Sequence, residues 1–85
     1  MKQVHLLELL EGSSVYDDVE GMEIHQTKVL KSASIVHYSY DGNTFIDVWN
    51  CNNGMITVDP DIEPTNRFIK GDTQFNIIKA LLTNS

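Results

Sequence analysis

The segment that decides the fold is residues 34–58, which read SIVHYSYDGNTFIDVWNCNNGMITV. It contains three runs of β-branched and aromatic residues, separated by the sequences Asp41-Gly42 and Asn53-Gly54. Such dipeptides between apolar runs are typical of tight hairpin turns. We therefore predict a three-stranded antiparallel meander over residues 34–58.

The length of each turn decides which side chains share a face of this sheet, because successive side chains of a strand point to opposite faces. With two-residue loops, one face carries Val36, Tyr38, Tyr40, Phe45, Asp47, Trp49, Cys51, Ile56 and Val58. The opposite face then carries Ile35, His37, Ser39, Ile46, Val48, Asn50, Met55 and Thr57. A three-residue first loop would reverse the pairing of the first strand.

The second of these faces is unusually apolar for a sheet surface left in water. One alternative is that the two faces of the sheet are covered, one by an N-terminal helix and the other by a C-terminal helix. The other alternative is a partner or self-association surface rimmed by carboxylates, in a homodimer for example. Its apolar interface would consist of Ile35, Ile46, Val48 and Met55.

Helices are predicted at both ends of the chain. Residues 4–11 have the apolar spacing of a short amphipathic helix that Gly12 would end, with an N-terminal strand as the alternative. Asp72 or Thr73 can cap a second helix. Its apolar stripe consists of Phe75, Ile77, Ile78, Leu81 and Leu82.

The remaining segments complete a small α+β fold. Residues 22–30 and 67–70 are predicted as further strands, whereas residues 13–21 and 59–64 read as acidic loops. The chain is short enough for a single core. We expect one compact domain over residues 1–85, a small antiparallel sheet packed with an N-terminal and a C-terminal helix.

The charge of the chain restricts its partners. Among 85 residues, 12 are acidic and 6 are basic, which gives a net charge of −6. Direct binding of nucleic acid requires clustered Lys and Arg to displace counterions, and here the basic residues are scattered. An acidic protein of this kind suits a partner with a basic surface.

The sequence also favours a cytoplasmic location. No apolar run approaches the roughly 18–20 residues that span a bilayer, and Glu8 interrupts the apolar stretch that a signal peptide would need. The chain has one cysteine, Cys51, so an intrachain disulfide is excluded.

Tests for reaction chemistry give no enzyme, no metal and no cofactor. Asp59, Asp61 and Glu63 alternate as in a calcium loop, but Pro64 stands where that loop needs glycine and Lys70 where it needs glutamate. The three histidines are far apart in the sequence. Cys51 and His37 are predicted on opposite faces of the sheet, which favours a thiol packed among apolar side chains over a nucleophile.

Asp47 is the exception on its face, because it falls between Phe45 and Trp49. An unpaired carboxylate there would carry a large desolvation cost. We therefore expect a structural hydrogen bond to Tyr38 or to a loop amide, with a shifted acid in a pocket as the alternative.

The function that these features favour is non-enzymatic binding of the basic surface of a larger protein. Small acidic inhibitors and regulators carried by phages or other mobile elements, including mimics of nucleic acid, have this size and charge, and such a protein would act in the host cytoplasm. The predicted partner-binding residues are Asp17, Asp18, Glu20, Glu23, Asp59, Asp61 and Glu63.

Residues 35–41, Ile-Val-His-Tyr-Ser-Tyr-Asp, resemble a strand of the phage uracil-DNA glycosylase inhibitor family, whose members are also small, acidic α+β proteins. The resemblance covers under a tenth of the chain. The alternative function, from a different class, is a small homo-oligomeric ligand-binding or catalytic protein. Its site would form between subunits around Asp47, His37 or Tyr38.

Overall fold

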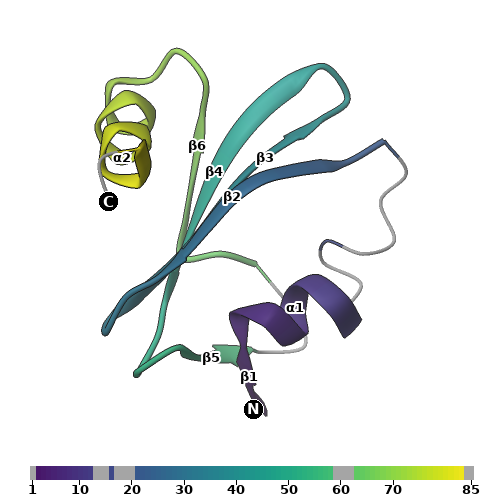
Figure 1. The fold of residues 1–85 in the computed structure, drawn as a ribbon, viewed down its shortest axis with the longest axis vertical. Helices are drawn as coiled ribbons and strands as arrows, with labels where there is room; N and C mark the ends of the chain where they lie inside the picture. Colours follow the sequence, from purple (N-terminus) through teal and green to yellow (C-terminus); the bar gives the residue numbers. More distant parts are fainter. Residues whose placement is uncertain (1, 13–15, 17–20, 59–62, 84–85) are drawn as a thin grey trace.

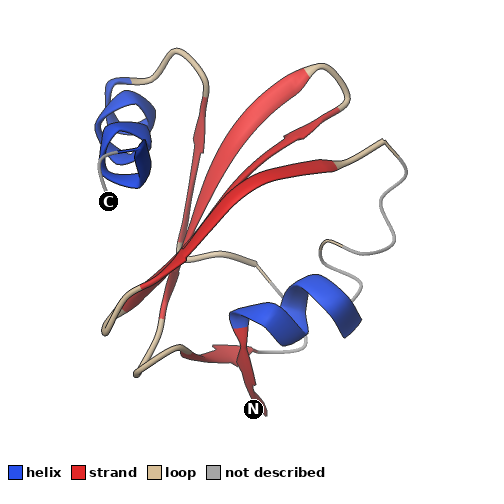
Figure 2. Cartoon of the chain, in the orientation of Figure 1, coloured by secondary structure: helices blue, strands red, loops and turns tan. Residues whose placement is uncertain are grey.

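The computed structural model describes residues 2–12, 16, 21–58 and 63–83, and these form an α+β fold as predicted (Figures 1 and 2). In chain order the elements are β1 (Lys2–His5), α1 (Leu6–Gly12), β2 (Glu23–Val29), β3 (Ala33–Tyr40), β4 (Asn43–Asn50), β5 (Met55–Val58), β6 (Asn66–Ile69) and α2 (Thr73–Thr83). The N-terminal segment combines the two alternatives of the sequence, because a short strand runs directly into the helix.

The main sheet is an antiparallel meander in the order β2-β3-β4-β6. Its central hairpin has the predicted two-residue loop, since Tyr40 pairs with Asn43. Asp41 and Gly42 both have positive φ, 51° and 81°, which is the backbone of a type I′ turn. The predicted sharing of faces between β3 and β4 is therefore confirmed.

The predicted pairing of the third strand of the meander with β4 is wrong, although residues 55–58 do form a strand. The Asn53-Gly54 turn forms, with reciprocal hydrogen bonds between Asn52 and Met55, but β5 pairs with β1 in a separate two-stranded sheet. The outer edge of β4 is occupied by β6 instead. The backbone amides of Cys51 and Asn53 donate to the carbonyl oxygens of Ser32 and Lys31, which directs the chain away from β4.

Gly54 is required where this turn meets β1 and β2. Its φ is +89°, and a Cβ there would lie 2.9 Å from Nε2 of His5 and 3.2 Å from Cγ1 of Val29. Both the backbone conformation and the close approach exclude a larger residue without rearrangement.

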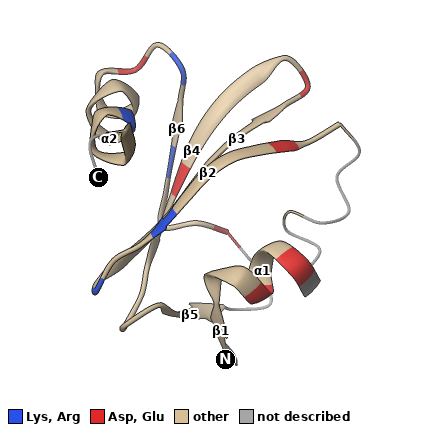
Figure 3. Cartoon of the chain, viewed as in Figure 1, with Lys and Arg blue, Asp and Glu red and all other residues tan. Residues whose placement is uncertain are grey.

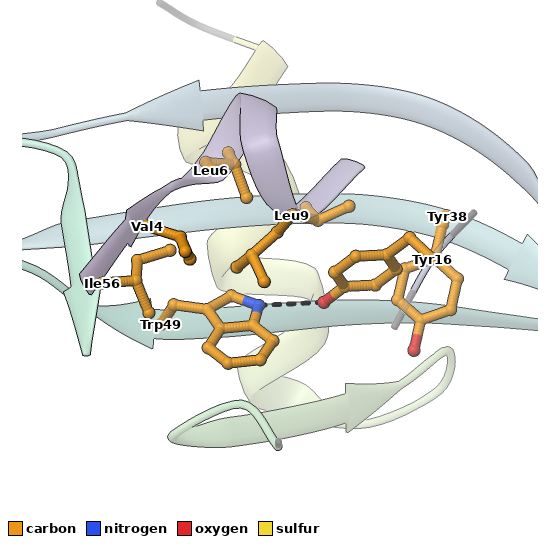
Figure 4. Close-up of a cluster of buried hydrophobic side chains, with 8 residues drawn as sticks. Val4, Leu6, Leu9, Tyr16, Tyr38, Trp49 and Ile56 are labelled. Atoms are coloured by element: carbon orange, nitrogen blue, oxygen red, sulfur yellow. Dashed lines mark hydrogen bonds between the residues drawn. The ribbon is translucent and has the colours of Figure 1, made fainter. Parts of the chain in front are cut away.

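The main sheet is covered on both faces (Figure 1). One face packs against β1, α1, β5 and Tyr16, and Figure 4 shows most of this first cluster. Its buried members are Val4, Leu6, Leu9, Tyr16, Val36, Tyr38, Trp49 and Ile56. The other face packs against α2 in a second cluster, whose buried members are Ile35, Ile46, Phe75 and Leu82.

The predicted apolar interface is placed beneath α2. Ile35 and Ile46 are buried there and Val48 is half-buried, whereas Met55 lies on β5 and is exposed. The structure thus has the alternative in which the helices cover the sheet. Ile35 and Ile46 consequently offer no free surface, and Val48 is only partly accessible.

The stripe predicted for α2 is wider than the face that the helix buries. Phe75 and Leu82 are buried and Ile78 is half-buried, but Ile77 and Leu81 are exposed. Positions 75, 78 and 82 share one side of a helix, while 77 and 81 lie one turn apart on another. Neither helix among the described residues has the length and apolar character of a membrane span.

Candidate functional site

The predicted acidic residues that the structure describes are Glu23 on β2 and Glu63 before β6, and both are exposed. Asp17, Asp18, Glu20, Asp59 and Asp61 lie outside the described residues. Two further exposed carboxylates, Glu8 and Glu11, lie on α1 (Figure 3). The prediction missed them, although they occupy the polar positions of the helix that the sequence indicated.

Asp47 is the completely buried acid, with an exposed fraction of 0%. It pairs in register with Arg67 of β6, whose Nε and Nη2 donate to Oδ1 and Oδ2 over 2.8 and 2.9 Å. This two-pronged geometry is the strongest form of an arginine–carboxylate pair. Between residues that the structure describes, it is the one ion pair.

Tyr16 extends this pair into a buried network. Its hydroxyl donates to Oδ2 of Asp47 over 2.8 Å and accepts a hydrogen bond of the same length from Nε1 of Trp49 (Figure 4). The Tyr16 ring also meets the rings of Tyr38 and Trp49 edge-on. The network therefore joins β4, β6 and a residue of the segment between α1 and β2.

The electrostatics of the network follow from burial and the Asp47 charge. Burial, reinforced by that charge, raises the pKa of Tyr16 and of Tyr38 above the usual tyrosine range. The hydrogen bonds to Asp47 raise the pKa of Arg67 above its ordinary value. Because these pKa values are raised, the phenols of Tyr16 and Tyr38 are neutral and the guanidinium of Arg67 is charged at neutral pH.

The expectation that Asp47 has a structural partner is confirmed. Its main partners, however, are not the predicted Tyr38 or a loop amide. Arg67 and Tyr16 hold the carboxylate, and Tyr38 lies close enough for its pKa to respond to it. The network stabilises the packing of the first cluster. A buried charge held in this way costs several kcal/mol if one partner is removed.

Cys51 and His37 lie on opposite faces of the main sheet, as predicted. The Cys51 thiol packs against the first cluster and lies 3.5 Å from the carbonyl oxygen of Leu30. His37 contacts Phe75 of α2, with 5.8 Å between ring centroids. The two side chains therefore form no nucleophile–base pair.

A polar hollow of about 390 Å³ lies between α2 and the main sheet. His25, His37, Lys70 and Lys79 line it, with Phe75 among the apolar lining. These residues are far apart in the sequence, because they come from β2, β3, the turn after β6 and α2. Among the described residues, no three His, Cys, Asp or Glu side chains gather in a way that could hold a metal ion.

Comparison of the chain with protein-family models, with curated proteins and with solved structures found no match. What the protein does is therefore inferred from its own residues.

Proposed function

We propose that this chain is a non-enzymatic acidic protein-binding domain, an inhibitor or regulator that binds the basic surface of a larger protein. Its size and charge are those of phage and mobile-element proteins that act in the host cytoplasm, including mimics of nucleic acid. The partner is a protein whose own ligand is polyanionic.

The observation that supports this proposal is which charged side chains the fold pairs with each other and which it leaves unpaired. The pair of buried Asp47 with half-exposed Arg67 neutralises one acid with one base, so 11 acidic and 5 basic residues remain outside this pair and the net charge is still −6. The exposed carboxylates of the predicted partner-binding residues Glu23 and Glu63 have no ion pair with another described residue. Charges left uncompensated within the chain attract an oppositely charged partner and speed its association.

The most probing experiment combines capture of a partner with neutralisation of the predicted acidic segments. The purified protein is immobilised, a partner is isolated from host lysate, and its affinity and association rate are measured with purified components. The test variant carries Asp59→Asn, Asp61→Asn and Glu63→Gln, and a second one adds Asp17→Asn, Asp18→Asn and Glu20→Gln. We expect association to slow by about tenfold or more and to lose much of its salt dependence.

A matched control neutralises three other exposed acids, with Glu8→Gln, Glu11→Gln and Asp41→Asn. Far-ultraviolet circular dichroism establishes that each variant is folded. Unchanged affinity in the six-site variant would refute the proposal. An equal loss in the control would show that net charge alone, and no defined acidic segment, drives the interaction.

The alternative of a catalytic or ligand site between subunits receives no support at two of its three residues. Asp47 and Tyr38 are 0% and 3% exposed, so neither side chain is offered to a second subunit. The third residue, His37, lies in the polar hollow.

A further inference from the structure

The hollow beneath α2 lies beside an irregularity of the sheet. Ile24 pairs with Tyr38 and Gln26 pairs with His37, so His25 is the additional residue of a β-bulge in β2. Because Ile24 already pairs with Tyr38, a regular ladder would also place His25 opposite His37, and the effect of the bulge is to bring Gln26 opposite His37 as well. The His25 and His37 rings lie 4.9 Å apart, and both line the hollow together with Gln26.

The side chain of His25 is oriented by a short hydrogen-bonded chain. Its Nε2 and Oγ of Ser39 are 2.6 Å apart, and the same Oγ lies 3.2 Å from Oγ1 of Thr44. Thr44 also lines the hollow. The imidazole is therefore held in place by neighbouring strands.

The helix contributes one row of side chains to the hollow. Phe75, Lys79 and Thr83 all line it, and their spacing of four residues places them on one side of α2. Lys70 follows β6, where its backbone amide donates to the carbonyl oxygen of Thr44. Buried Phe75 forms part of the floor, and the exposed lysines lie at the rim.

The described ionisable side chains that line this hollow are all basic, in a molecule that is acidic as a whole. They are two lysines and two imidazoles, and no carboxylate of a described residue lines the hollow. Asp72, the described acid closest in sequence to Lys70, instead approaches the backbone amide of Ile69 with its Oδ2. Burial lowers the pKa of His37, and the charges of His25 and Lys79 lower it further.

His37 also has an unused hydrogen-bonding atom. Its Nε2 is buried and meets no hydrogen-bond partner among the described residues. Buried polar atoms are rarely left in this state, and each such atom calls for an explanation. An anion in the hollow would favour the protonated imidazole and relieve the repulsion among the basic groups, and a small movement of the ring would bring the buried Nε2 into reach of it.

We infer that the hollow formed by His25, His37, Thr44, Lys70 and Lys79 is a binding site for the phosphate or sulfate group of a small molecule. The lysines would supply charge, and the imidazoles and the Thr44 hydroxyl would supply directed hydrogen bonds. The hollow, at about 390 Å³, lies within the size range of small-molecule sites. It is large compared with the roughly 30 Å³ share of one liquid water, so it also has room for the organic part of an ester.

The first test uses inorganic sulfate, whose charge is constant over the titration range of histidine. The pKa values of His25 and His37 are measured by NMR in sulfate and in chloride at equal ionic strength. We expect sulfate to raise the pKa of His37, because an anion that prefers the protonated imidazole shifts its protonation by linkage. Lys79→Gln or Lys70→Gln should weaken sulfate binding by about tenfold or more, the loss of one charge-assisted hydrogen bond.

The matched control is Lys31→Gln, which removes the same charge from an exposed position outside the hollow. An equal loss in this control, or the same pKa of His37 in sulfate and chloride, would overturn the inference. A second probe, phenyl phosphate, tests the room for an organic group and should bind more tightly than sulfate. If it does not, the site takes a bare oxyanion and the ester assignment is wrong.

This inference is independent of the proposed protein-binding function. The described residues of the predicted partner-binding set, Glu23 and Glu63, do not line the hollow. Lys79→Gln is therefore expected to leave binding of a basic partner unchanged, and each proposal can fail without the other.

Discussion

Tyr16 is the residue at the centre of the buried network. It stands in an acidic segment without regular spacing, yet its hydroxyl connects the buried carboxylate of Asp47 with the indole of Trp49. A hydroxyl with two buried partners contributes more than its own desolvation, since its removal leaves both partners short of a hydrogen bond.

We expect Tyr16→Phe to lower the free energy of unfolding by about 1–3 kcal/mol, the cost of unsatisfied buried polar groups. Urea denaturation followed by far-ultraviolet circular dichroism measures the change, because the signal does not depend on Trp49 itself. The control is Tyr40→Phe, at a tyrosine that is 40% exposed, and it should change stability by less than about 0.5 kcal/mol. Equal effects in the two variants would contradict the structural role of the network.

The sequence predicts that Asp47 needs a partner, but it does not identify the partner. The position of Asp47 within an apolar alternation is local information, and it was sufficient for the first conclusion. Arg67 becomes its neighbour because β6 pairs with β4, and Tyr16 lies 31 residues away in the chain. Such pairings depend on the tertiary arrangement and leave no local signal.

At the scale of elements, α2 shows the difference between an apolar pattern and a buried face. Its five predicted apolar positions span too wide an arc for one contact with the sheet. Phe75 reaches the centre of the second cluster with 1% exposure, whereas Ile77 remains 51% exposed.

We expect Phe75→Ala to destabilise the protein by about 3–5 kcal/mol, as usual for the loss of a buried aromatic side chain. Ile77→Ala should change stability by less than about 0.5 kcal/mol, because the side chain is largely in water. Equilibrium denaturation in urea compares the two variants. A larger loss for Ile77→Ala would mean that α2 packs with a different face.

The predicted turns are confirmed where the prediction of strand neighbours is not. Asp41-Gly42 and Asn53-Gly54 both adopt the positive φ values that these residue types favour, which is a property of a few adjacent residues. The partner of β5 is decided by competition for the outer edge of β4, where β6 is found. The sequence did predict residues 67–70 as a strand, but nothing local specified its place in the sheet.

The two candidate sites also differ in whether the sequence alone is sufficient to find them. The exposed acids could be found from composition and helix periodicity alone. The polar hollow could not, because it requires the pairing of β2 with β3 to place His25 beside His37 and the packing of α2 to bring Lys79 to the same hollow.

For the molecule as a whole, His37 predicts a dependence of stability on mildly acidic pH. Its pKa in the folded state is lower than the ordinary value of about 6.5, so the unfolded chain binds more protons in this range. Its contribution is therefore present above about pH 6.5 and is lost as the pH falls through the lowered pKa. The groups that impose this shift are His25 on β2 and Lys79 on α2, together with burial.

We expect the wild-type protein to lose more stability than His37→Gln between about pH 7 and pH 5, in buffers without phosphate or sulfate. Urea denaturation at a series of pH values measures both slopes. Parallel curves for the two proteins would show that His37 does not contribute to the pH dependence.

The β-bulge at His25 also affects the tendency of the protein to aggregate at high concentration. β2 pairs with β3 on one side, and no described strand pairs with its outer edge. A regular open edge of this kind is able to pair with the edge strand of another copy, which extends the sheet from molecule to molecule. Since the bulge breaks the repeat of amide and carbonyl groups within β2, an incoming strand cannot pair along its whole length. We therefore expect the bulge at His25 to protect the open edge of β2 against pairing with other copies of the chain.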